Sequence, residues 1–176
     1  MTDPLHLVPH NTESLHFTRL SDLMRRVMSN AFESATTLGE EIDFVKSYLQ
    51  IETNRFDNKF TWSVRLDEEV DMAVVIPKML IQIFVENAIK HGIFHLDAGG
   101  EIEIGIHRTG PGILILVTDN GVGFEKAFEL EGRKGKGLEI LNNYLQLFNK
   151  HHEVTISCKI LNRASGGRTR VLIDVL

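Results

Sequence analysis

Apolar residues recur along this chain with two periods, one typical of helices and one typical of strands. The helical period runs from about Ser14 to Phe32 and again from Thr37 to Arg55. At the start of the second stretch, Thr37 and Glu40 have the spacing of a capping box, in which each satisfies a backbone amide of the first turn. The first third of the chain is therefore predicted to be mostly helical.

Farther along the chain, strands alternate with helices. Two more helices are predicted, one that opens at Pro77 and closes at Gly92 and one that begins near Leu138. The strand pattern is found in five stretches: residues 60–66, 101–106, 113–118, 154–160 and 169–175. The turn residues at 109–112 predict a hairpin between the second and third of these. Strands covered by helices on one side predict an α+β fold, an α/β sandwich with a mixed, mostly antiparallel sheet.

The same pattern divides the chain into an amino-terminal helical segment, residues 1–36, and a larger domain, residues 37–176. The amino-terminal helix has an apolar stripe of the kind through which partner helices pair, formed by Leu15, Leu20, Leu23, Met24, Val27 and Met28. We expect this segment to belong to or adjoin a dimerisation region and to make the protein a homodimer. Packing of the stripe against the larger domain of the same chain is the alternative.

A polar stripe interrupts the apolar helix expected at residues 77–92. Four polar side chains fall in one sector of its surface: Glu86, Asn87, Lys90 and His91. Burying a carboxylate, an amide, an ammonium and an imidazole together costs free energy unless partners satisfy them, so the stripe predicts a bound ligand. The alternative is an exposed helix face on which Glu86 and Lys90 form an ion pair.

A second polar segment follows the apolar run at residues 113–117, which is expected to be buried on both faces of the sheet. Asp119 is the first charge after this run, and the chain continues as Asn120-Gly121-Val122-Gly123-Phe124. A ligand-free hairpin turn is one interpretation, because Asn-Gly pairs favour such turns. Residues 124–128 lack the alternation of a returning strand, however, and lead into a charged, glycine-broken stretch at 132–138 that indicates a lid.

Together these segments resemble the nucleotide-binding motifs shared by gyrase, heat-shock chaperone, histidine kinase and mismatch-repair ATPases. Residues 86–92 are similar to the asparagine box, residues 119–124 to the first glycine box and residues 135–138 to the second. Their order and spacing are far more specific than any single box. Residues 20–26 and 41–56 resemble LytS-like sensor histidine kinases, so that the resemblance covers roughly residues 18 to 176.

This resemblance implies roles for individual side chains. Asn87 would supply an amide oxygen to Mg²⁺, and Asp119 would accept a hydrogen bond from the exocyclic amine of adenine. Lys90 and His91 would lie near the phosphates of ATP. Glu86 would orient a water molecule or polarise an accepting imidazole, as a positioned carboxylate can.

The two glycine boxes imply contacts made by the backbone. Gly121 and Gly123 would let the chain approach the base, and Gly135 and Gly137 would let amides meet phosphate oxygens where a helix begins at Leu138. Lys136 departs from the small or apolar residue usual between the last two glycines. It either adds a phosphate contact or is a solvated lysine of the lid.

The resemblance implies the ATP-binding catalytic domain of a two-component sensor histidine kinase, which passes the γ-phosphate of Mg-ATP to a histidine and onward to a response regulator. The acceptor segment of this family, of the type Pro-His-Phe-aliphatic-Phe-Asn, has no counterpart here, and His10 in Pro9-His10-Asn11-Thr12 is not expected to replace it. The acceptor is therefore expected outside this segment. Two alternatives are an ATP-hydrolysing conformational switch, in which Glu86 activates water, and a non-catalytic nucleotide-binding module.

Composition and charge agree with this expectation. A formal charge of −5 disfavours a nucleic-acid partner, for which a basic surface is expected. Cys158 is the only cysteine and cannot form an internal disulfide, which favours a reducing, cytoplasmic location. No stretch of the sequence reaches the length of a membrane span. Any membrane attachment would come from segments not in this chain.

Overall fold

The computed structural model describes residues 35–97, 99–122, 137–152, 154–162 and 169–176. The helix expected at residues 14–32, the segment around His10 and the expected lid lie outside these residues. In the part of the chain that is described, no helix is long and apolar enough to cross a membrane.

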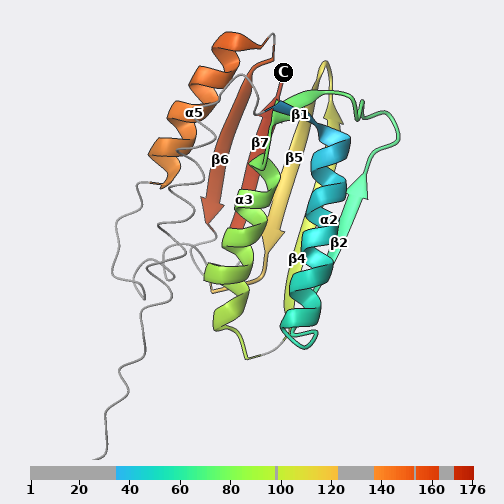
Figure 1. Ribbon diagram of the computed structural model, residues 1–176, viewed down its shortest axis with the longest axis vertical. Coiled ribbons are helices and arrows are strands. Elements are labelled where there is room, and N and C mark those ends of the chain that lie inside the picture. Colours follow the sequence, from blue (N-terminus) through green and yellow to red (C-terminus); the bar gives the residue numbers. More distant parts are fainter. Residues whose placement is uncertain (1–34, 98, 123–136, 153, 163–168) are drawn as a thin grey trace, which may run out of the picture.

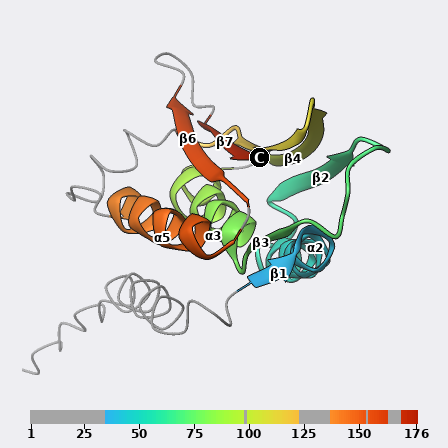
Figure 2. The same cartoon turned by 90° about the horizontal axis from the view of Figure 1, so that it is seen from above.

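A single five-stranded sheet forms one layer of the fold. Its strands follow the order β2 (Phe60–Leu66), β4 (Gly100–Thr109), β5 (Gly112–Asp119), β7 (Thr169–Val175) and β6 (Ile156–Asn162). β2 runs parallel to β4, and every other pair of neighbours is antiparallel. Helices α2 (Leu38–Arg55), α3 (Leu80–Asn87) and α5 (Gly137–His151) lie together on one face (Figures 1 and 2). The predicted fold class is confirmed.

The two faces of the sheet differ in burial, and the helices within the described residues cover one of them (Figures 1 and 2). On the helix side, Ile104 in β4 and Ile115 in β5 are completely buried. On the other side, Leu114 and Leu116 of β5 are only partly buried. The prediction that the apolar run at residues 113–117 is buried on both faces is therefore wrong. Leu114 and Leu116 lie on the face of this mostly antiparallel sheet that the described helices do not cover.

The start of α2 follows the sequence prediction. The backbone N–H of Glu40 donates to Thr37 Oγ1 at 3.2 Å, and the Thr37 N–H donates to a Glu40 side-chain oxygen at 3.1 Å, which completes a capping box. Just before it, the short strand β1 (Ala35–Thr37) pairs with β3 (Val75–Pro77). The apolar side of α2 packs on the core through Leu38, Ile42, Val45 and Leu49.

The helix predicted from Pro77 to Gly92 starts later and changes its geometry. Pro77 ends strand β3, and Met79 adopts a left-handed conformation with φ 65° before α3 begins at Leu80. The helix then continues beyond Asn87 as a π turn, η1 (Ala88–Gly92), and a 3₁₀ turn, η2 (Ile93–His95). The predicted opening at Pro77 is wrong because a proline is equally compatible with an edge strand, where its missing N–H costs nothing. The predicted end at Gly92 matches the end of the π turn.

The remaining elements lie close to their predicted positions. β2 and β7 have the predicted bounds, and the Gly110-Pro111 turn joins β4 to β5 as a hairpin. α5 packs on the sheet through Leu141, Tyr144, Leu145 and Phe148. β6 begins at Ile156 rather than at residue 154, and the side chain of Asn149 in α5 bonds both the N–H and the carbonyl of Ile156 at 2.9 Å.

Candidate functional site

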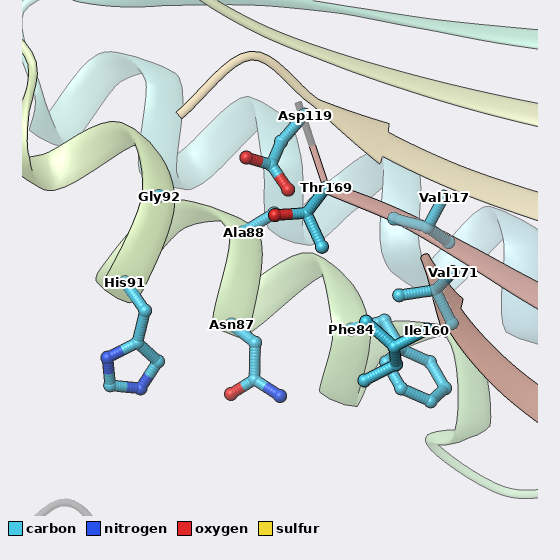
Figure 3. Close-up of a pocket in the computed structure, with 10 residues that line it drawn as sticks. All are labelled: Phe84, Asn87, Ala88, His91, Gly92, Val117, Asp119, Ile160, Thr169 and Val171. Carbon is cyan, nitrogen blue, oxygen red and sulfur yellow. The ribbon is translucent and has the colours of Figure 1, made fainter. Parts of the chain in front are cut away.

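A cavity lies between α3 and the ends of β5 and β7. It is open to solvent on one side, and its empty space, open solvent included, is about 410 Å³. One side, which we call the helix wall, is formed by Phe84, Asn87, Ala88, His91 and Gly92. The other side, which we call the sheet wall, is formed by Val117, Asp119, Ile160, Thr169 and Val171 (Figure 3).

Three residues that the sequence singled out as ligand-binding line this one cavity. Asn87 is the last residue of α3, His91 lies in the π turn that follows, and Asp119 ends β5. Asn87 and His91 extend from successive turns to the same side of the helix (Figure 3). The expected convergence of the asparagine box and the first glycine box in space is thus present in the structure.

Asp119 is a buried acid with well-defined neighbours. It is 5% exposed, and the N–H of Gly121 donates to its Oδ1 at 2.9 Å. Burial raises the pKa of the Asp119 carboxyl to about 6, although hydrogen bonds from the Gly121 amide and the Thr169 hydroxyl oppose the shift. A carboxylate in such a place is stabilised by any further donor. It is therefore suited to bind an N–H group of a ligand.

Thr169 is a site residue that sequence reasoning missed. It is the first residue of β7 and the register partner of Asp119 across the β5–β7 ladder. Its buried hydroxyl bonds the same carboxylate and lines the same cavity. The strand pattern at residues 169–175 was visible in the sequence, but the neighbour of β7 in the sheet was not. No pattern among the residues near Thr169 in the sequence therefore predicts its pairing with Asp119.

Two glycines bring the motif segments into backbone contact. A Cβ added at Gly121 would lie 2.2 Å from the Gly92 Cα, and one added at Gly92 would lie 2.7 Å from Asp119 Oδ1. The N–H of Val122 also faces the Gly92 carbonyl at 3.4 Å. The end of the asparagine box and the first glycine box therefore touch directly. Any side chain at either glycine would push these two segments apart.

Glu86 and Lys90 are not among the residues that line the cavity. Lys90 Nζ donates to Glu86 Oε2 at 2.8 Å, and Gln82 Nε2 donates to Glu86 Oε1 at 3.0 Å. The polar stripe of the sequence is thus divided. Asn87 and His91 face the cavity, whereas Glu86 and Lys90 form the ion pair that was the alternative interpretation of the stripe.

Apolar side chains close one end of the cavity. They come from four different elements and comprise Phe84, Val117, Ile160 and Val171. An apolar slot that ends at a buried acid suits a planar heteroaromatic ring, because the faces of the ring contact hydrocarbon while its edge meets the acid. Sequence reasoning identified the polar residues of the site and missed this lining, since its members look like ordinary core residues.

The remaining predicted contacts belong to the second glycine box and the lid. Gly137 is the first residue of α5, which begins one residue before the expected start at Leu138. The contacts predicted for four other residues lie outside the described part of the chain: Gly123, Gly135, Lys136 and the Leu138 side chain. Their roles stay predictions, as do the individual roles of the residues that line the cavity.

Two family models match the chain. The model "Histidine kinase-, DNA gyrase B-, and HSP90-like ATPase" matches residues 74–176, and the model "Histidine kinase" matches residues 7–60. The first match contains both cavity walls and exceeds half of the chain. The second contains α2 and the segment before it.

Two curated relatives are sensor kinases of the LytS type. The sensor protein LytS of Staphylococcus saprophyticus is 32% identical over 161 residues, which cover 81% of this chain and 27% of that protein. The sensor histidine kinase/phosphatase LytS of Staphylococcus aureus is 33% identical over 142 residues, which cover 74% of this chain and 24% of that protein. The chain thus spans about a quarter of the length of these relatives.

Solved structures with the same fold are also histidine kinases. The histidine kinase AdeS of Acinetobacter baumannii has a TM-score of 0.57 at 16% identity and covers 93% of this chain and 79% of that one. The kinase ThkA, solved in complex with the response regulator protein TrrA, has a TM-score of 0.57 at 17% identity and covers 99% and 52%. At these identities the likeness shows the fold alone. With the family match over residues 74–176, it establishes that the chain belongs to the histidine kinase-, DNA gyrase B- and HSP90-like ATPase family.

Proposed function

We propose that this chain is the ATP-binding catalytic part of a cytoplasmic two-component sensor histidine kinase. In this proposal ATP and Mg²⁺ bind in the cavity between the helix wall and the sheet wall, and the γ-phosphate passes to a histidine outside this segment. The observation that carries the proposal is that Asn87 and Asp119, from separate motifs, line the same cavity. Family membership and the LytS-type relatives support it.

The sheet wall has the chemistry needed to recognise adenine. Asp119 is buried among apolar residues, and the exocyclic amine of adenine is an N–H donor that would satisfy it. The guanine ring carries a carbonyl oxygen in place of that amine, and two acceptors would then face each other. We therefore infer that Asp119 selects adenine over guanine by the cost of an unsatisfied buried carboxylate.

The helix wall has the chemistry needed at the phosphate end. Asn87 offers an amide oxygen, a hard ligand of the kind Mg²⁺ prefers, and His91 offers a ring nitrogen one turn farther along. Mg²⁺ typically takes only one or two protein ligands when a nucleotide supplies phosphate oxygens. When bound, ATP supplies the phosphoryl group and Mg²⁺ balances its charge. The contribution of the chain is to hold and orient both.

The contacts of Glu86 do not support a role as a hydrolytic base. Both of its carboxylate oxygens already accept hydrogen bonds, from Gln82 Nε2 and Lys90 Nζ, and its side chain does not line the cavity. A base that activates water needs a lone pair directed at that water. This arrangement argues against the ATP-hydrolysing switch, in which Glu86 would be that base.

The partners follow from the same proposal. The structure of ThkA with TrrA pairs a kinase of this fold with a response regulator, and we infer a response regulator as the downstream partner here.

The apolar stripe at residues 15–28 is proposed to form a homodimer. Light scattering on the whole chain and on a Leu23→Asp variant tests the dimer. A mass that the variant leaves unchanged contradicts it.

A transfer assay tests the proposed activity. The chain is mixed with Mg²⁺, ATP labelled at the γ-phosphate, and a separately produced acceptor segment from the Staphylococcus aureus LytS relative. We expect label on the acceptor in an acid-labile, base-stable form typical of phosphohistidine, and loss of that label with Asn87→Ala. A Gln50→Ala variant on the exposed side of α2 is the matched control and should keep the transfer.

Other outcomes of the same assay decide between the alternatives. Release of inorganic phosphate without any labelled acceptor, abolished by Glu86→Ala, would contradict the kinase and favour the hydrolytic switch. Binding of ATP with neither transfer nor release would favour the non-catalytic nucleotide-binding module.

A further inference from the structure

A buried acid on α2 caps a different helix. Glu41 lies in the first turn of α2 and is only 2% exposed. Its Oε2 accepts a hydrogen bond from the N–H of Met79 at 2.9 Å, and its Oε1 accepts from the N–H groups of Ile81 and Gln82 at 3.1 and 3.3 Å. All three donors belong to the beginning of α3. Glu41 thus does for α3 what Thr37 does for its own helix.

The helix α3 has no cap of its own. Its N-cap residue is Met79, which has a left-handed backbone and no side-chain hydrogen bond to the helix. The free amides of a first helical turn need acceptors, and their partial positive charge attracts a carboxylate. Because Glu41 is the acceptor, the start of α3 is fixed relative to α2 and not only to the residues that precede it in the chain.

A row of side-chain hydrogen bonds continues from this cap along α3. Gln82, whose backbone N–H bonds Glu41, donates through Nε2 to Glu86, and Glu86 accepts from Lys90 in the π turn. The row is continuous from α2 to the residue beside His91. The position of Glu41 therefore bears on the helix wall, where Asn87 and His91 line the cavity.

The sheet wall is held in a different way. Asp119 is held by the Gly121 amide and the Thr169 hydroxyl, both on its own side of the cavity. Gly92, at the end of the helix wall, packs against Asp119 and Gly121, so a displacement at the start of α3 would move Asn87 more than Asp119. The two ends of a bound nucleotide would respond differently to such a displacement.

We propose that Glu41 is a positioning residue, which sets the register of α3 from α2 and thereby places Asn87 for the metal–phosphate end of the nucleotide. The inference rests on the proposed function, since it assigns a role at the same site.

Calorimetric titration of the whole chain with ADP, with and without Mg²⁺, tests this role. Glu41→Gln keeps the size of the side chain but presents an NH₂ group to amides that need an acceptor. We expect the gain in ADP affinity that Mg²⁺ gives to fall by about five- to tenfold, in the lower range of couplings between sites. Metal-free ADP binding, which depends on the sheet wall, should change less than about twofold.

Glu52→Gln is the matched control. Glu52 is also a buried acid of α2, 9% exposed, but its carboxylate pairs with Arg55 of its own helix at 3.4 Å. It should leave both ADP affinities unchanged. A merely structural role for Glu41 would lower thermal stability and affect metal-free and metal-dependent binding alike, so the split between the two titrations separates positioning from general destabilisation.

The results that overturn the inference are distinct from those that overturn the proposed function. Wild-type protein that binds no ADP contradicts the proposed function itself. The positioning role alone is overturned if the wild-type protein binds ADP and Mg²⁺ raises the ADP affinity of Glu41→Gln as much as that of the wild type. It is also overturned if Glu41→Gln loses the same factor in ADP affinity with and without Mg²⁺. If Glu41→Gln does not fold, Glu41→Asp, which keeps the charge but reaches less far, replaces it. Faster hydrogen exchange of the amides at residues 79, 81 and 82 would show that the cap is weakened in Glu41→Asp. If Mg²⁺ then still raised the ADP affinity as much as in the wild type, the inference would be overturned.

Discussion

The two walls of the cavity are built in different ways. On the sheet wall, Asp119 is 5% exposed and is held by a backbone amide and a threonine hydroxyl. On the helix wall, Asn87 and His91 are half-buried and stand where an α-helix becomes a π turn at Ala88. One wall consists mostly of buried residues on inner strands of the sheet, and the other is a partly exposed helix whose hydrogen-bond pattern changes within the site.

In the proposed site, the difference would match what the two ends of a nucleotide require. A base is recognised by its shape and its edge, and a fixed buried acid discriminates strongly because a wrong partner leaves it unsatisfied. The phosphate end changes its charge and its contacts during turnover, which suits a wall with polar, partly exposed groups. π turns are frequent at functional sites for a similar reason, since they place a side chain where a regular helix does not.

The largest expected effect comes from the backbone contact that joins the two walls. In Gly121→Ala the new Cβ would lie 2.2 Å from the Gly92 Cα. This clash can be relieved only if the backbone at Gly121 or at Gly92 shifts, which would displace the wall to which that residue belongs or is joined. We expect a loss of about 1–3 kcal/mol in the free energy of unfolding, as for overpacked cores, together with loss of ADP binding. Chemical denaturation and calorimetry measure both.

Gly39→Ala is the control for this substitution. Gly39 lies in the first turn of α2, where an added Cβ would come no closer than 3.4 Å to a neighbouring atom, the Met72 carbonyl oxygen. Alanine is the better helix former, so stability should be unchanged or slightly higher. Equal stability of the Gly121→Ala and Gly39→Ala proteins would show that the walls do not touch as described.

The next largest effect concerns Asp119, where binding and stability should change in opposite directions. A hydrogen bond to a charged group is worth about 1.5–3 kcal/mol, so Asp119→Asn should weaken ADP binding by roughly ten- to a hundredfold. The same change removes a buried charge whose pKa is raised to about 6 and should stabilise the ligand-free protein at pH 7. Calorimetry and thermal unfolding give the two numbers, and unchanged ADP affinity would remove Asp119 from the site.

A smaller effect follows from the titration of Asp119. Its pKa in the folded protein, about 6, lies above the ordinary value of 3.8, because ionisation is disfavoured by burial. In the proposed site the ionised carboxylate would accept the adenine amine, so ADP affinity should fall as the pH falls through about 6, by roughly tenfold at a pH one unit lower. The stability of the ligand-free protein should show the opposite trend and decrease as the pH rises from about 4 to about 6.

The Asp119→Asn variant provides the control for this pH dependence, since it shares every other titrating group. Its ADP affinity should lack the step near pH 6. The same step in both proteins would assign the titration to another group, such as a phosphate of the nucleotide.

The smallest effect is expected at the ion pair beside the cavity. Lys90 is 44% exposed in its side chain and pairs with Glu86 at helical spacing, and such pairs contribute about 0.3–0.5 kcal/mol to stability. Lys90→Met should therefore leave the thermal unfolding midpoint almost unchanged. A loss of ATP affinity with no loss of adenosine affinity would show that Lys90 also reaches the phosphates, whereas equal losses would contradict that role.

The parts of the fold set by local patterns were predictable from the sequence. The capping box at Thr37 and the strands β2 and β7 were found because capping spacing and alternation are properties of neighbouring residues. Pro77 was misassigned because the proline ring is compatible with a first helical turn and with an edge strand, and only the pairing with β1 decides between them.

The parts of the site that depend on contacts between distant segments were not predictable in the same way. Thr169 lies beside Asp119 because β5 and β7 pair in the sheet. Glu41 and its partner Ile81 in α3 lie 40 residues apart in the sequence. Asn87, His91 and Asp119 were singled out because their motifs are local. Their convergence in one cavity is the tertiary fact that the structure adds.

Calorimetric titration of the whole chain with ADP and with GDP, in the presence and absence of Mg²⁺, tests the central claim most directly. If Asp119 reads the base and Asn87 holds the metal in the same cavity, ADP should bind more tightly than GDP, by about tenfold or more, and Mg²⁺ should strengthen ADP binding. Equal affinity for the two nucleotides, with no effect of the metal, would contradict it.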